Sequence, residues 1–128
     1  MGFDENKVLS PQEKGILGVE AFIHEYIESG GDVIGTEIPY KITGVNGRMD
    51  LVGKRNGVYE LFEVKNVKKL SIPWSFTKNQ RHLLPLLEKG HAFEFYGPKA
   101  FRLGLDVNTP ISKYNYQLIH KNINILSK

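Results

Sequence analysis

Apolar positions near the start of the chain recur at helical spacing. Residues that advance by about 100° per position share one side of a helix when they lie three or four apart. The apolar residues of this stripe are Ile16, Val19, Ile23, Tyr26 and Ile27. Residues 10–13, Ser-Pro-Gln-Glu, form a capping box with proline at the first helical position. Gly30-Gly31 is typical of a helix end, so the pattern predicts a helix from Pro11 to about Ser29.

The following residues have the pattern of strands. Residues 32–42 show alternation with a period of two, which predicts an extended run. Two apolar-rich runs, 47–52 and 59–65, lie on either side of Asn56-Gly57. This dipeptide between apolar runs is the strongest short-range signal for a two-residue hairpin turn. Both faces of the hairpin carry apolar residues, so we expect it in the middle of a covered sheet.

A second helix is predicted from Thr77 to Gly90, because Gln80 completes another capping box and leucines follow at helical spacing. Pro85 should kink or shorten this helix. Residues 92–96 read as a strand, expected to run parallel to the strand 59–65 through a crossover. Residues 114–126 also have a β-like pattern. The order predicts an α/β fold, a three-layer-like sandwich with a small mixed central β-sheet flanked by helices.

Length and composition bound the answer further. A chain of 128 residues predicts a single domain, 1–128, with a core over about residues 10–97 and a C-terminal extension over 98–128. The absence of cysteine excludes thiol chemistry and cysteine metal sites. No apolar run approaches the roughly 20 residues that span a bilayer, so no membrane association is expected.

The charge distribution is more informative than the net charge of +3. Between Val64 and Leu87 there is no acidic residue. The basic residues in this stretch are Lys65, Lys68, Lys69, Lys78 and Arg81. A basic run is usually a solvated surface, but this one begins beside two acids, which favours contact with a phosphate backbone.

The hairpin predicts an unusual cluster of charges. A turn at residues 56–57 places Val52 opposite Leu61 and Asp50 opposite Glu63, with Lys65 on the same face as Glu63. Like charges at opposed positions destabilise a sheet. Two carboxylates and an ammonium group are what a hard divalent cation and a phosphodiester require. The alternative is a pair of surface acids in a different register.

Three further residues are candidates for the same site. Glu20 lies within the apolar stripe of the first helix, where a buried carboxylate needs a metal or a lysine; the alternative is an exposed helical glutamate. Gln80 shares a face with the leucines of the second helix, although the capping box alone accounts for it. Arg48 is expected to lie across from Lys65, within reach of a bound phosphate, or to be a surface residue.

These residues resemble the PD-(D/E)xK nuclease superfamily, whose pattern is an acid at the end of one strand and then acid-x-lysine on the next. The matching segments are Arg48-Met49-Asp50 and Glu63-Val64-Lys65. Family members often carry a glutamate on the first helix and a glutamine on the helix after the acid-x-lysine strand, the places of Glu20 and Gln80. The resemblance covers roughly residues 12–96 and implies a restriction-endonuclease-like core.

A looser resemblance is to the C-terminal nuclease domains of bacterial polymorphic toxins, including contact-dependent growth inhibition effectors. The segments that carry it are residues 47–52, 62–66 and 76–80. The chain departs from the pattern of the PD-(D/E)xK superfamily at Met49, where proline is common. It implies an interbacterial toxin domain that acts on DNA or tRNA in the bacterial cytoplasm. Such a domain is delivered as the C-terminal part of a secreted effector and is neutralised by a cognate immunity protein.

The resemblance implies a role for each residue. Asp50, Glu63 and the carbonyl of Val64 would hold Mg²⁺ or Mn²⁺, with Zn²⁺ also possible, and Glu20 would complete the shell. Lys65 would orient the attacking water, and Gln80 would position Lys65 or the substrate. The residues expected to contact phosphate are Lys68, Lys69, Lys78, Arg81 and Arg48. The alternatives are a housekeeping Holliday-junction, repair or restriction-type DNase, and a non-catalytic nucleic-acid-binding domain on the same fold.

Overall fold

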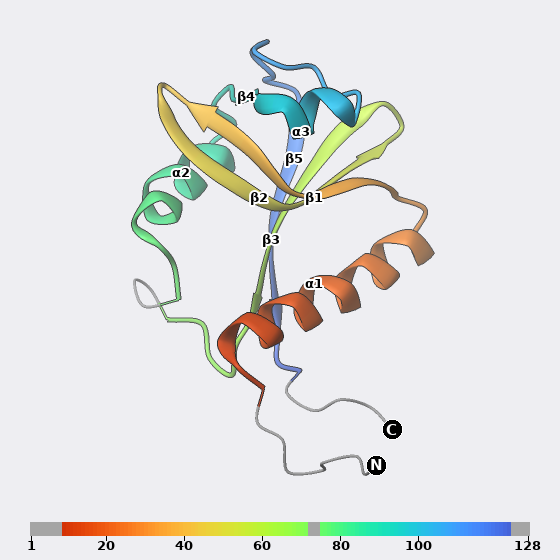
Figure 1. The fold of residues 1–128 in the computed structure, drawn as a ribbon, viewed down its shortest axis with the longest axis vertical. Coiled ribbons are helices and arrows are strands. Elements are labelled where there is room, and N and C mark those ends of the chain that lie inside the picture. The colour runs from red at the N-terminus through yellow and green to blue at the C-terminus, as the bar shows by residue number, and fades with distance from the viewer. Residues whose placement is uncertain (1–8, 72–74, 124–128) are drawn as a thin grey trace.

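The computed structural model describes residues 9–71 and 75–123 (Figure 1). Its elements in chain order are α1 (Pro11–Glu28), β1 (Asp32–Ile42), β2 (Val45–Arg55), β3 (Val58–Asn66), α2 (Lys78–Glu88), β4 (Glu94–Phe95), α3 (Gly97–Arg102) and β5 (Tyr114–Lys121). The chain is therefore an α/β protein, as its hydrophobic pattern predicts.

The strands form one mixed five-stranded sheet in the order β4-β1-β2-β3-β5. Strands β1, β2 and β3 are an antiparallel meander, and β5 lies parallel to β3. The turn between β2 and β3 has positive φ at both Asn56 (52°) and Gly57 (79°), as a primed hairpin turn requires. It pairs Val52 with Leu61, which confirms the predicted register.

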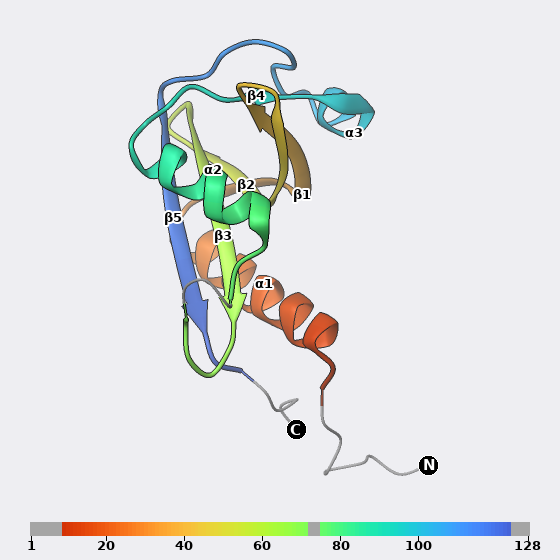
Figure 2. The same ribbon diagram turned by 90° about the vertical axis from the view of Figure 1, so that its left-hand side faces the viewer.

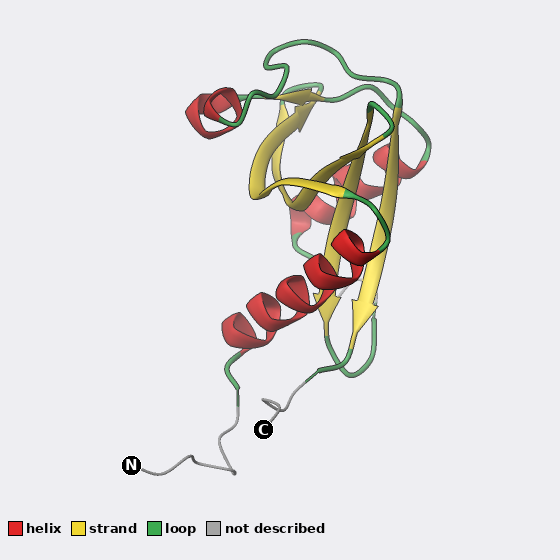
Figure 3. Ribbon diagram, turned by 90° about the vertical axis from the view of Figure 1, so that its right-hand side faces the viewer, coloured by secondary structure: helices red, strands yellow, loops and turns green. Residues whose placement is uncertain are grey.

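Helices cover both faces of the sheet. Figures 2 and 3 view the molecule from opposite sides, and α2 lies in front of the sheet in one and α1 in the other. Phe22 and Tyr26 of α1 pack against Leu51, Phe62 and Val64 in the smaller of two core clusters. The larger cluster joins the other face to the buried leucines of α2, which are Leu83, Leu84 and Leu87. The site described below therefore lies between two packed layers.

Helix α1 begins and ends where its signals predict, with both bonds of the Ser10–Glu13 capping box present and Ser29 as the C-cap. Its buried face matches the predicted stripe only in part: Tyr26 is buried and Val19 and Ile23 pack against the same core cluster, but the stripe is displaced around the helix. Gly18 and Phe22 lie at the sheet, whereas Ile16 and Ile27 are more than half exposed. A Cβ atom on Gly18 would lie 2.7 Å from the Cβ of Asn66, so the absence of a side chain there lets α1 approach β3 and determines which face is buried.

The pairing of the last strands differs from the prediction. Residues 92–96 contribute β4, which pairs antiparallel with β1 at the far edge of the sheet, not parallel with β3. Phe93 and Phe95 belong to the larger core cluster, where their rings stack edge-on against Tyr40 and Tyr59, and this burial draws β4 to β1. The parallel neighbour of β3 is β5. The segment after residue 97, expected as an extension, thus supplies a full strand of the sheet.

Candidate active site at the end of the β2–β3 hairpin

Asp50 and Glu63 meet where the ladder between β2 and β3 ends. The last regular pair is Leu51 with Phe62, one step before Asp50 would oppose Glu63. At that step the Oδ2 atom of Asp50 accepts a hydrogen bond from the backbone N–H of Val64 at 2.9 Å. The Asp50 side chain thus occupies the place of the next ladder bond, and its carboxylate is held beside the Glu63–Lys65 segment.

Glu63 is a buried carboxylate whose hydrogen bonding is incomplete. Its side chain is 2% exposed, and its Oε2 atom accepts a hydrogen bond from Nε2 of Gln80 at 2.5 Å. The Oε1 atom has no partner among the described residues. Burial, together with the negative charge of Asp50, raises the pKa of Glu63 to about 9. Such a group is costly to the fold unless a cation or a proton neutralises it.

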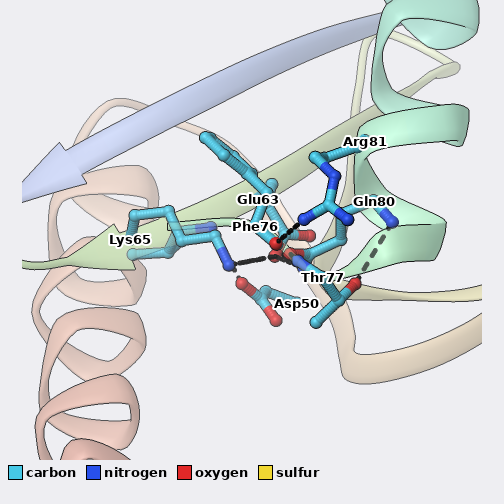
Figure 4. A network of polar contacts seen from close by, with 8 residues as sticks. Asp50, Glu63, Lys65, Phe76, Thr77, Gln80 and Arg81 are labelled. Atoms are coloured by element: carbon cyan, nitrogen blue, oxygen red, sulfur yellow. Dashed lines mark hydrogen bonds and ion pairs between the residues drawn. The ribbon is translucent and has the colours of Figure 1, made fainter. Parts of the chain in front are cut away.

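Lys65 brings a positive charge to the same point (Figure 4). Its Nζ atom lies 3.8 Å from Oε2 of Glu63 and donates a hydrogen bond to Oε1 of Gln80 at 2.9 Å. The ammonium group also lies 5.1 Å from the centre of the Phe76 ring. The Lys65 side chain is mostly buried, and its contacts with Glu63, Gln80 and Phe76 hold the ammonium group in one position beside the acids.

Gln80 has both of the roles that its sequence position allows. Its Oε1 atom accepts a hydrogen bond from the backbone N–H of Thr77 at 3.0 Å, which completes the capping box of α2. The same amide group accepts a hydrogen bond from Lys65 and donates one to Glu63. The start of α2 and the charged groups of β3 are therefore locked to one another through a single side chain.

Two predicted site residues are placed differently from the expectation. Glu20 is exposed rather than buried, because Gly18 and Phe22 are the residues that α1 turns toward the sheet, although Glu20 still lines a hollow that Asp50 and Glu63 share. Arg48 does not pair across from Lys65; it lies opposite Pro39 of β1 and faces Glu37 at 3.6 Å, with both side chains largely exposed. Among residues 9–71 and 75–123, no three acids or histidines are close enough together to hold a metal ion.

The basic residues predicted to contact phosphate are exposed on the loop after β3 and the first turn of α2. They are Lys68, Lys69, Lys78 and Arg81. Arg81 also donates a hydrogen bond to the backbone oxygen of Phe76 at 2.9 Å, and so helps to fix this loop. Their exposure leaves these side chains accessible to a polyanion near the site.

Two hollows adjoin the acids. One, of about 690 Å³, lies along α1 and is lined by Glu20, Asp50, Glu63 and Lys65 among others. The other, of about 500 Å³, lies between the β1–β2 turn and the start of α2. Asp50, Gln80 and Glu37 line both hollows. The acids thus sit on the boundary between two concave surfaces.

Glu37 was not a candidate from the sequence. Its neighbours pair with Leu51 and Met49, so its own register position faces Asp50. Its φ of 52° is a left-handed conformation that a glutamate rarely adopts. Strained backbone of this kind is concentrated at functional sites. The sequence could not have identified Glu37, because neither its residue type nor the alternating strand pattern indicates a left-handed backbone conformation.

The residues present fit a hard divalent cation. Mg²⁺ is typically bound by one or two carboxylates and keeps several waters, so Asp50 and Glu63 are sufficient protein ligands. The unpartnered Oε1 atom of Glu63 is the strongest sign, since a cation would supply the missing neutralisation. Glu20 lines the same hollow as both acids and would act at most through water.

Comparisons with known proteins do not place the chain in a family. No protein-family model matches it, and a search of curated proteins finds no match. Within the described residues, no helix combines the length and apolar character that a membrane crossing requires. The functional argument therefore rests on the site itself.

Proposed function

We propose that the protein is a divalent-metal-dependent endonuclease that hydrolyses phosphodiester bonds, with a restriction-endonuclease-like core of the PD-(D/E)xK type. The observation that carries the proposal is the buried Glu63 carboxyl group, which lies next to the Asp50 carboxylate and has its Oε2 atom 3.8 Å from Nζ of Lys65. Two neighbouring carboxylates on a sheet, one of them buried, destabilise the fold unless a cation or a proton offsets their repulsion.

Asp50 and Glu63 would hold Mg²⁺ or Mn²⁺, or Zn²⁺, with the Val64 carbonyl as a further ligand. When bound, the cation supplies two effects: a lower pKa for water and neutralisation of charge on the phosphate. Lys65 orients the attacking water and offsets the negative charge that develops on the phosphoryl oxygens. Gln80 keeps Lys65 and Glu63 at their present separation, so the ammonium group does not drift into a closed ion pair with the acid.

The placement of the residues on the fold supports this proposal. Glu20, Asp50, the Glu63–Lys65 segment and Gln80 lie on α1, β2, β3 and α2, the element types on which the superfamily carries its matching residues. The exposed lysines after β3 and at the start of α2 would bind backbone phosphates without reading sequence. The substrate is DNA or tRNA.

The segments that resemble polymorphic toxins extend the proposal to biology. The domain would act in the bacterial cytoplasm as an interbacterial toxin, delivered there by a larger secreted effector, and a cognate immunity protein would neutralise it. Inducible expression of the domain in the cytoplasm of a bacterium should then stop growth, and expression of the Glu63→Gln variant should not. Normal growth with an active, soluble nuclease would instead favour a housekeeping repair or restriction-type enzyme.

The direct test is incubation of purified protein with plasmid DNA and with total tRNA, each with Mg²⁺, Mn²⁺, Zn²⁺ or EDTA. We expect metal-dependent loss of one substrate, absent in Glu63→Gln and in Lys65→Met. The matched controls are Glu28→Gln and Lys113→Met, which change the same residue types at exposed positions away from the site. Failure to cleave either substrate with any of the metals would leave a nucleic-acid-binding domain as the better account.

A further inference from the structure

The smaller hollow, of about 500 Å³, has the construction of a binding pocket for a neutral ring. We propose that it is a nucleoside subsite, which holds the base and sugar next to the scissile phosphate. This inference rests on the nuclease proposed above, since Asp50 and Gln80 form the boundary of the hollow with the acids. Its size lies within the range of pockets that enclose small ligands.

The floor of this subsite is formed by close packing. A Cβ atom on Gly47 would lie 2.7 Å from Cδ1 of Leu83 and 3.0 Å from Cε1 of Tyr40, so the strand backbone lies directly on both side chains. Tyr40 and Leu83 are almost fully buried. The floor is therefore rigid and apolar, which suits the face of a base.

The walls are fixed by two further contacts. Nδ2 of Asn79 donates a hydrogen bond to the backbone oxygen of Asn46 at 2.8 Å, which ties the β1–β2 hairpin to the first turn of α2. On the opposite wall, the backbone N–H of Tyr96 donates to the oxygen of Pro39 at 3.3 Å. The hollow is thus largely formed before a ligand arrives, as small-molecule sites usually are.

Charge indicates which part of a nucleotide fits. The charged residues of the lining are Glu37, Asp50 and Arg48, two acids and one base, and Arg48 already faces Glu37. Lys41, whose Nζ atom lies 5.6 Å from the centre of the Tyr96 ring, is not part of the lining. The excess of acids in the lining therefore favours an uncharged group over a phosphate. A base and sugar carry no charge, and the amides of Asn46 and Asn79 offer donors and acceptors to a base edge, while Tyr96 offers a ring for stacking.

The two hollows together indicate the path of the substrate. The larger hollow is lined by Lys65 and by four acids, two of which are the proposed metal ligands. The smaller hollow is lined by the amides of Asn46 and Asn79 and by two tyrosines. Because they meet at Asp50, a strand whose phosphate lies at the acids would place one neighbouring nucleoside in the smaller hollow. That arrangement suits a flexible or unpaired strand, whose base is free to leave its stack.

The first test measures binding without requiring cleavage. Full-length, isotope-labelled protein is titrated with free ribonucleosides and deoxyribonucleosides, and separately with inorganic phosphate, and followed by nuclear magnetic resonance. We expect the nucleosides to shift the side-chain amide signals of Asn46 and Asn79 and the ring signals of Tyr96, and phosphate to leave them in place. Absence of these shifts at saturating nucleoside, or the same shifts with phosphate, would overturn the subsite whether or not the protein is a nuclease.

The second test measures what the base contributes to cleavage. An oligonucleotide with one mapped cleavage site is made abasic at each neighbouring position in turn. We expect one position at which base removal lowers kcat/KM by about 5- to 160-fold for the wild type, the range of a single stacked base. Tyr96→Ala should lose that sensitivity, whereas Tyr96→Phe and the exposed control Phe101→Ala should keep it. Active enzyme with no sensitive position would refute the subsite and leave the nuclease intact.

Discussion

Glu63 makes the stability of the metal-free protein depend on pH in a direction opposite to that of most acids. Its pKa is raised from 4.5 to about 9 by burial and by the charge of Asp50. Between these values the folded protein holds one proton more than the unfolded chain. Unfolding therefore releases a proton, and this contribution to stability, complete below about pH 4.5, is lost as the pH rises toward 9.

The magnitude follows from linkage. One released proton lowers the free energy of unfolding by about 1.4 kcal/mol per pH unit. From about pH 6 to about pH 8 the loss is therefore about 2.7 kcal/mol. Glu63→Gln removes the titrating group and keeps its shape, and its amide can donate a hydrogen bond to Asp50. The variant should show the remaining pH dependence of the protein without this part.

The assay is urea unfolding of both proteins in EDTA at the two pH values, followed by circular dichroism. The difference between proteins in their pH dependence isolates Glu63, because all histidines are common to both. We expect the free energy of unfolding of Glu63→Gln, relative to that of the wild type, to be about 2.7 kcal/mol higher at the higher pH than at the lower pH. Parallel stabilities over this range would show that Glu63 is charged at pH 6, and the buried, proton-holding carboxyl would be refuted.

Four further substitutions test the local geometry. Gly18→Ala should destabilise the protein by about 1 kcal/mol in urea unfolding, because the new methyl group meets Asn66, which three hydrogen bonds hold in place. Gly15→Ala, which has open space around it, should instead stabilise the protein by up to about 1 kcal/mol. A reversed order would refute the close approach of α1 to β3. Glu37→Gly should raise the free energy of unfolding by about 1 kcal/mol through relief of the left-handed backbone, and an equal loss would contradict that conformation. Gln80→Glu should keep the capping box of α2, seen as unchanged helicity, but lower cleavage at least 10-fold because it cannot donate to Glu63; full activity would remove Gln80 from the site.

Local signals in the sequence were sufficient for much of the fold. Both capping boxes, the ends of α1 and the Asn56-Gly57 turn depend on contacts within a few residues, and all of them are present. The register of the β2–β3 hairpin follows from its turn alone, so the neighbourhood of Asp50 and Glu63 was predictable. The place of Gln80 in the first turn of α2 was also predictable, because it lies three residues after Thr77 and completes the capping box.

The rest depends on contacts between distant segments. The pairing of residues 94–95 with β1 is decided by burial of aromatic rings in a cluster that no local pattern reveals. The buried face of α1 depends on the close approach of Gly18 to Asn66 of β3, and with this face buried Glu20 is exposed. Arg48 does not lie across from Lys65 because the pairing of β2 with β3 ends at Leu51, whereas its pairing with β1 continues past Arg48.

The central claim is that Asp50 and Glu63 bind the cation while Lys65 acts in the chemical step. The most direct measurement is single-turnover cleavage as a function of Mn²⁺ concentration, with Mn²⁺ binding measured separately by calorimetry. We predict that Lys65→Met binds Mn²⁺ as the wild type does but cleaves at least 100-fold more slowly, and that Glu63→Gln loses binding and cleavage together. Wild-type cleavage in EDTA, or Mn²⁺ binding unchanged by Glu63→Gln, would contradict the account.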